Sequence, residues 1–291
     1  MPPRRTKTDA QRSRLGGHFD VLICGASFAG LTVARELAGA RCADGSAPRV
    51  LLLDRHEIGA HQTSACAAPT EWLAALGLER SVLQTFRDLV VHTPHTTVRY
   101  TLPWTFSTFD YQELCSLLHS QNTAEFETAT VQGLGDASGP GAPITVRTDR
   151  GEVSAGLVVD ALGWQRVLSA QRCRPPAAPL SRGLEVKASG RSNEMELWVE
   201  RSIVPAGYGW SFPAQDEVRV GVGSYDSGFH VKQPTVDLAD RLGRDTVNYQ
   251  GNWIPHRLHD ATEDNVFFVG DSAGPARGTF SFRCQSTATS R

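Results

Sequence analysis

Continuous apolar runs of strand length open the chain. Residues 21–24 and 50–53 form two such runs, and the first includes the β-branched Val21 and Ile23. Runs of this kind are typical of strands that are buried on both faces of a parallel sheet. Between them, apolar residues recur at helical spacing from Leu31 to Ala38. The order strand, helix, strand therefore predicts an α/β sheet.

Two later segments, 156–164 and 265–274, repeat the pattern of an apolar strand that ends beside an acid and a glycine. We interpret both as strand-to-helix junctions of the same sheet. The other predicted elements are a hairpin over 88–103 that turns near Pro94, helices that begin at Thr70 and at Asp110, and short strands at 129–131 and 144–146.

After the linker-like segment 174–179, residues 183–224 alternate in the manner of antiparallel strands. Tyr208, Trp210 and Phe212 are two residues apart, so all three should project from one face of the sheet. Two interpretations stay open. The three rings are either a core face or an apolar wall for a flat ring or an apolar ligand.

The ends of the first two strands carry candidate chemistry. Gly25 permits a tight turn, Gly30 permits close packing of the helix, and the N–H groups of residues 27–30 would favour a pyrophosphate. Asp54 ends the second strand, where an acid can bind ribose hydroxyls. The alternatives are a simple tight turn and a surface aspartate. Because three strand ends share this chemistry, the sequence favours a dinucleotide site.

Composition limits the other function classes. The chain has 291 residues, is 40% hydrophobic and has a formal charge of −2, which gives no general case for nucleic acid. Residues 1–18 contain basic side chains and no apolar core, so we expect a disordered leader and neither a signal peptide nor a membrane anchor. Six scattered cysteines favour a reducing cytoplasm, and His92 and His95 have no third ligand for a metal.

Taken together, these stretches resemble FAD-dependent oxidoreductases of the geranylgeranyl reductase-like group, within the wider family of aromatic hydroxylases and halogenases. The resemblance covers about residues 19–274 and rests on the segments 25–30, 54–55, 160–163, 208–213 and 270–274. It implies that FAD is held by Gly25, Ala26, Ser27, Phe28, Ala29, Gly30, Asp54, Arg55, Val131, Gly163, Gly270 and Asp271. It places Cys66, Tyr208 and Trp210 on the catalytic side.

Two departures from the family pattern affect the expected activity. Gly274 stands where hydroxylases typically have His, which favours the reductase side. Residues 275–291 lack the apolar periodicity of the helix that faces the flavin in the family. We therefore expect a truncated product, and an inactive flavoprotein stays one of the alternatives.

The predicted fold is α/β: a Rossmann-like FAD-binding domain with an inserted antiparallel β-sheet substrate domain. Its expected boundaries are a leader at 1–18, FAD-binding parts at 19–87, 105–173 and 258–291, a hairpin at 88–104, and a substrate sheet at 174–257. The expected reaction is hydride transfer from reduced flavin to a C=C bond of an isoprenoid or another apolar substrate. The electron donor is NAD(P)H or another donor, and a peripheral membrane contact is left open. A monooxygenase of the same fold is the alternative.

Overall fold

The computed structural model describes residues 13–62, 66–136, 139, 141–170 and 180–274. It divides into two compact units, and each is described by itself. Unit 1 comprises the described parts of Met1–Glu57, Gln121–Arg172 and Asp260–Ser272. Unit 2 comprises the described parts of Ile58–Ser120, Cys173–His259 and Ala273–Arg291.

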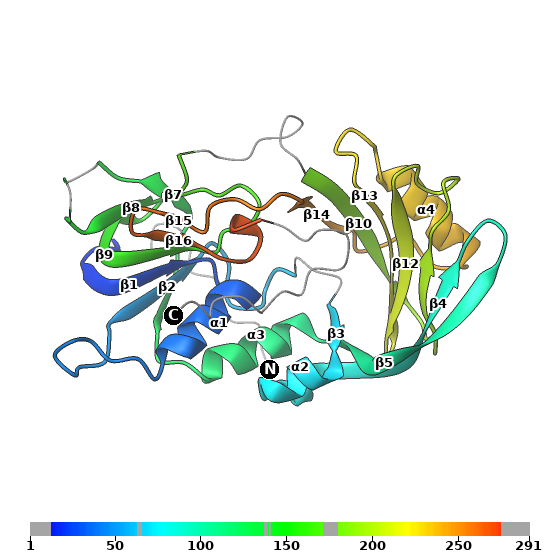
Figure 1. The fold of residues 1–291 in the computed structure, drawn as a ribbon, viewed down its shortest axis with the longest axis horizontal. Coiled ribbons are helices and arrows are strands. Elements are labelled where there is room, and N and C mark those ends of the chain that lie inside the picture. Colours follow the sequence, from blue (N-terminus) through cyan, green and yellow to red (C-terminus); the bar gives the residue numbers. More distant parts are fainter. Residues whose placement is uncertain (1–12, 63–65, 137–138, 140, 171–179, 275–291) are drawn as a thin grey trace. The chain divides into compact units, whose positions relative to one another are not determined.

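Unit 1 is built on an eight-stranded mixed sheet (Figure 1). Its main path has the order β15-β16-β9-β1-β2-β6, and β7 and β8 extend it beside β9. The pairs β16–β9, β9–β1, β1–β2 and β2–β6 are parallel. The strands are β1 (His18–Cys24), β2 (Val50–Asp54), β6 (Glu125–Thr128), β7 (Val131–Leu134), β8 (Ile144–Thr148), β9 (Gly151–Asp160), β15 (Thr262–Glu263) and β16 (Val266–Phe268).

The central strands of unit 1 are buried as their apolar runs predict. The last four residues of β1 and the first four of β2 are all buried. Helix α1 (Phe28–Leu37) connects these two strands and buries Gly30, Leu31 and Ala34. Strand β16 is followed by the short 3₁₀ helix η3 (Gly270–Ser272). The carboxyl ends of the five parallel strands therefore meet at one edge, which is where ligands bind in open α/β sheets.

Unit 2 is built on a second eight-stranded sheet with the order β14-β10-β13-β12-β11-β4-β5-β3. The hairpin expected near Pro94 is present as β4 and β5. The strands are β3 (Ala67–Pro69), β4 (Val82–His92), β5 (Thr97–Phe109), β10 (Leu180–Ser189), β11 (Met195–Trp198), β12 (Gly207–Ala214), β13 (Glu217–Ser224) and β14 (Gln250–Pro255). The helices are α2 (Thr70–Ala75), η2 (Glu79–Ser81), α3 (Tyr111–Ser120) and α4 (Lys232–Arg241).

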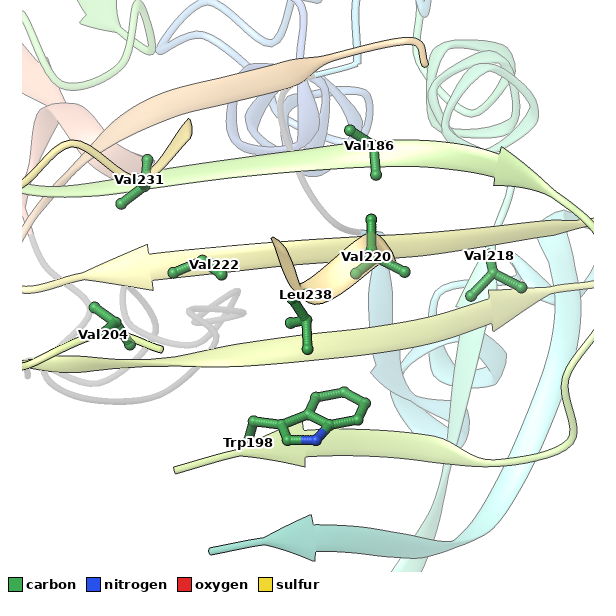
Figure 2. Close-up of a cluster of buried hydrophobic side chains, with 9 residues drawn as sticks. Val186, Trp198, Val204, Val218, Val220, Val222, Val231 and Leu238 are labelled. Atoms are coloured by element: carbon green, nitrogen blue, oxygen red, sulfur yellow. The ribbon is translucent and has the colours of Figure 1, made fainter. Parts of the chain in front are cut away.

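The two faces of the unit 2 sheet differ. Helix α4 covers one face, where Leu238 packs on a cluster that includes Val186, Val220 and Trp198 (Figure 2). The opposite face carries a second apolar cluster that contains Trp210, and Tyr208 packs against it. Alternation along each strand separates these two sets of side chains, as a sheet requires.

Several elements differ from the sequence-based expectations. The segment after β9 forms turns instead of a helix, because its backbone is held by Asp160 in the way described below. Residues 13–17 are not a free leader: Leu15 bridges Gly151 and Ser13 accepts hydrogen bonds from Arg150. The strand expected at 129–131 is instead the boundary between β6 and β7.

The division into units also places segments differently. The described residues of 58–87 and 105–120, which the sequence assigns to the FAD-binding domain, belong to unit 2, and the predicted domain boundaries stay predictions. The predicted linker at 174–179 and the C-terminal segment 275–291 lie outside the described residues, as do residues 1–12 of the leader. In the described part of the chain, no helix combines the length and the apolar character needed to cross a bilayer.

Candidate functional site

The turn between β1 and α1 requires its two outer glycines. Gly25 has a φ of 111°, and a Cβ there would lie 2.3 Å from the carbonyl oxygen of Ala161. A Cβ on Gly30 would lie 1.8 Å from the carbonyl oxygen of Gly25. Only glycine fits these positions, so α1 begins directly against the ends of β1 and β9. The roles predicted for the two glycines match this geometry.

Asp54 connects this turn to the end of β2 through hydrogen bonds. Its Oδ2 accepts a hydrogen bond of 2.8 Å from the N–H of Ala26, and its Oδ1 accepts one of 2.9 Å from the N–H of His56. A carboxylate has further lone pairs, so these bonds leave acceptor capacity for a ligand hydroxyl. The expected ribose contact of Asp54 stays a prediction. The neighbouring Arg55 is exposed.

Asp160, at the end of β9, organises the loop that follows. It is fully buried and accepts hydrogen bonds from the N–H of Leu162 at 2.9 Å and from the N–H of Leu168 at 2.8 Å. The Ser272 hydroxyl donates to its Oδ1 at 2.7 Å. Burial raises the pKa of Asp160, and these hydrogen bonds act against that rise. Asp160 therefore serves as the internal anchor of this loop.

Ser272 connects the same loop to the end of β16. Its Oγ also accepts a hydrogen bond of 2.9 Å from the N–H of Gly163. Arg166, which is 2% exposed, donates to the Ser272 carbonyl and lies over the ring of Phe268 at 3.8 Å. Its guanidinium also pairs with Glu263 at 3.0 Å. Sequence reasoning missed Arg166, because no motif marks an arginine within a turn.

The Gly-Asp pair at 270–271 lies beside the first turn of α1. Gly270 has a φ of 59°, and a Cβ there would lie 2.8 Å from the Cβ of Ala29. Burial raises the pKa of the adjacent Asp271 to about 6. Gly163 has a φ of 87°, and a Cβ there would meet no atom within 4 Å. The carboxyl edge of the sheet is therefore tightly packed at Gly270, whereas it leaves open space at Gly163.

Val131 starts β7, three residues after β6 ends. It follows Ala129, whose N–H donates to the carbonyl oxygen of Asp54 at 2.7 Å. Three of the predicted cofactor segments are therefore linked within unit 1: the turn 25–30, the β2 end with Val131, and the pair 270–271. We call this set of residues the strand-end cradle.

Within the cradle, the first turn of α1 suits an anion. The first turn of α1 contains no acidic side chain, so the positive end of the helix dipole is not neutralised from within the helix. A diphosphate placed there would meet backbone N–H groups and the helix dipole together. The residues present therefore fit a dinucleotide cofactor.

The three candidate catalytic residues lie in unit 2. Cys66 is fully buried, and burial raises the pKa of its thiol well above the usual value. Burial likewise raises the pKa of Tyr208, which packs at 6.0 Å from Trp210 and 6.3 Å from Tyr225. Trp210 is 6% exposed. Neither Cys66 nor Tyr208 is an acid near neutral pH, and their catalytic roles stay predictions.

Trp210 lies flat across the neighbouring strand because that strand has glycines. Gly221 is its register partner on β13, and a Cβ there would lie 2.2 Å from the indole. The indole Nε1 reaches over this strand and donates to Oε2 of Glu185 on β10 at 3.2 Å. The expectation that Tyr208, Trp210 and Phe212 share one face is confirmed by their common cluster.

A polar cleft of about 920 Å³ opens on unit 2. Charged and amide side chains contribute to it, including Lys187, Arg219, Glu217 and Gln250. Arg219 is 3% exposed, donates to the carbonyl oxygen of Cys66 at 3.3 Å and pairs with Glu217 at 2.8 Å. The sequence analysis did not identify these charged residues, because the aromatic pattern of β12 was the stronger signal.

His92 and His95 do not form a metal site in the described structure. His92 stacks on Trp198 at 4.7 Å and bonds Glu196 at 2.9 Å. Within the described ranges, no group of three or more His, Cys, Asp or Glu side chains is arranged to hold a metal ion.

Comparison with solved structures identifies the fold. A geranylgeranyl bacteriochlorophyll reductase-like protein from Thermoplasma acidophilum has a TM-score of 0.73 at 17% identity, over 89% of this chain and 72% of that one. PqsL of P. aeruginosa, solved with 2-aminobenzoylacetate, has a TM-score of 0.66 at 18% identity, over 89% and 80%.

A variant of the halogenase PltM in complex with FAD has a TM-score of 0.65 at 12% identity, over 88% of this chain and 64% of that one. No protein-family model matches the chain. At these identities the likeness concerns the fold. The chain has the fold shared by geranylgeranyl reductase-like proteins and flavin-dependent halogenases, as its motifs predict.

Proposed function

We propose that this protein is an FAD-dependent oxidoreductase. The observation that carries the proposal is the strand-end cradle, where the Gly25–Gly30 turn, Asp54 and the Gly270–Asp271 pair meet at the carboxyl ends of parallel strands. The fold neighbours, one of them solved with FAD, support the choice of a flavin over other dinucleotides.

Each part of the cradle has a distinct task toward the cofactor. The N–H groups at the start of α1 would bind the diphosphate, and Asp54 would accept from the ribose hydroxyls. Asp271 would contact the segment between the diphosphate and the flavin ring. Bound FAD would supply hydride chemistry, with NAD(P)H as the electron donor.

The substrate we propose is an isoprenoid or another apolar molecule with a C=C bond. Support comes from the face of the unit 2 sheet that α4 does not cover, where the partly buried Tyr208, Leu102 and Leu197 pack on a buried apolar cluster. Such a surface binds an apolar chain by excluding water from it. The protein orients this chain, and the cofactor supplies the hydride.

The first test is a titration of the purified chain with FAD, followed by absorbance and by the melting temperature. A specific ligand of the native state raises the transition by mass action, and about 100 Kd of free ligand adds about 2.7 kcal/mol. An unchanged transition and no protein-bound flavin would overturn the proposal.

A second test identifies the reaction. The FAD-bound protein is incubated with NADPH and geranylgeraniol, with and without oxygen, and the product is analysed by mass spectrometry. Reductase activity adds two hydrogens without requiring oxygen. Addition of an oxygen atom, only in the presence of oxygen, would instead identify a monooxygenase and contradict the proposed reduction.

A further inference from the structure

Glu185 is a buried carboxyl group that has no role in the proposed binding of FAD or substrate. It is 2% exposed and lies on β10, with Trp210 on one side and Gln250 of β14 on the other. The indole N–H donates to its Oε2 at 3.2 Å, and the Gln250 amide donates to its Oε1 at 3.4 Å. Both partners are neutral, so neither compensates a negative charge fully.

The register of four neighbouring strands aligns Glu185 with one residue on each of the other three. Gln250, Glu185, Gly221 and Trp210 are successive partners on β14, β10, β13 and β12. Residues directly opposite one another in neighbouring strands project from the same face. Glu185 therefore projects from the face of Trp210, at the border between the apolar cluster and the polar cleft, and Gln250 lines that cleft.

Charged groups surround this carboxyl on the same face. Lys187 stands two residues further along β10, opposite Arg219 of β13, which pairs with Glu217. Burial raises the pKa of Glu185 to about 7, Glu217 adds to the rise, and Arg219, Trp210 and Lys187 act against it. Proton transfer is most efficient from a group whose pKa is near the working pH. Cys66 and Tyr208 lie far above that range.

We propose that Glu185 is the proton donor for the ligand bound on this face of unit 2. The role rests on the proposed reduction of a C=C bond, which needs a hydride and a proton. Bound FAD, once reduced, would supply the hydride for one C–H bond as the π bond breaks. The Glu185 O–H bond breaks and its proton forms the second C–H bond. The carboxylate left behind accepts from Trp210, faces Lys187 and Arg219, and regains a proton from water in the cleft.

A fluorescence titration tests the titrating group independently of flavin. Because the indole of Trp210 donates to Glu185, ionisation of the carboxyl should change Trp210 emission with a midpoint near pH 7. The chain has six tryptophans, so Trp210→Phe identifies the signal. The midpoint should be absent from Trp210→Phe and from Glu185→Gln. The control is Glu196→Gln, which alters a carboxyl on the other face of the sheet and should leave the midpoint unchanged. A midpoint that persists in Glu185→Gln overturns the proposal.

A kinetic experiment tests the donor role itself. The FAD-bound protein is reduced with dithionite and mixed anaerobically with geranylgeraniol, and reoxidation of the flavin is followed between pH 6 and 8. Loss of a general acid should slow Glu185→Gln by about 100-fold and flatten its pH profile, with FAD affinity unchanged. A wild-type rate in Glu185→Gln overturns the donor role alone. Absence of reoxidation in the wild type overturns the proposed reduction, and the donor role with it.

Discussion

The Ser272 hydroxyl donates to Oδ1 of Asp160 at 2.7 Å, which joins the ends of β16 and β9. The same serine oxygen accepts from the N–H of Gly163, and Arg166 holds its carbonyl. These contacts fix the last strand end of the cradle relative to the loop after β9. The position of the Gly270–Asp271 pair, at the start of η3, thus depends on this buried network.

Ser272→Ala should destabilise the protein by about 1–3 kcal/mol, because it removes a donor to a buried carboxylate and an acceptor for Gly163. Chemical denaturation measures the change. Ser202 is exposed, so Ser202→Ala is the control and should change the free energy of unfolding by less than about 0.5 kcal/mol. Equal effects of the two substitutions would show that the network does not stabilise the loop.

Gly221→Ala and Gly223→Ala form a matched pair on β13. A Cβ on Gly221 would lie 2.2 Å from the Trp210 indole, whereas one on Gly223 would lie 3.5 Å away, an ordinary contact. Gly221→Ala should therefore displace the indole, shift its emission to the red and cost about 1–3 kcal/mol. Gly223→Ala should leave the emission unchanged. Matching spectra for both variants would contradict the placement of Trp210.

Cys66 should resist alkylation at neutral pH. The thiolate is the reactive form, and burial both raises the pKa of this thiol and blocks access to it. Cys42 is partly exposed and serves as the internal reference. Treatment with iodoacetamide followed by peptide mass spectrometry should label Cys42 at least about tenfold faster. Equal labelling rates for the two cysteines would contradict the burial of Cys66.

Stability should fall as the pH rises from about 4.5 to about 7. The pKa of Glu185 is raised from 4.5 to about 7 by folding, so its stabilising contribution is complete below the unfolded value and is lost through the folded one. The raised pKa of Asp271 acts in the same direction up to about pH 6. Urea denaturation at several pH values should show a smaller decline for Glu185→Gln. An identical decline in the variant would contradict the burial of Glu185.

The strand ends were predictable because each leaves a local signature. An apolar run that breaks at a glycine or an acid identified the ends of β1, β2, β9 and β16 without tertiary information. The common face of Tyr208, Trp210 and Phe212 followed from spacing by two. These features depend on neighbours along the chain, which a sequence displays directly.

Contacts between distant residues were not predictable in this way. Arg166 binds Ser272 and Glu263, and nothing near residue 166 indicates that its side chain is buried. The turns after β9 replaced an expected helix because Asp160 binds the N–H groups of Leu162 and Leu168. Glu185 meets Trp210 only through the register of three strands. Each of these contacts depends on which distant segments pair with one another. The alternation of apolar and polar residues along one strand does not determine that pairing.

Isothermal titration with FAD tests the cradle most directly, using the wild type with Gly30→Ala and Gly39→Ala. A Cβ on Gly30 would meet the Gly25 carbonyl at 1.8 Å, whereas one on Gly39 meets no atom within 4 Å. We predict that the wild type and Gly39→Ala bind FAD equally and that Gly30→Ala loses about 100-fold or more in affinity, about 2.7 kcal/mol. Absence of FAD binding by the wild type, or full affinity in Gly30→Ala, would contradict the account.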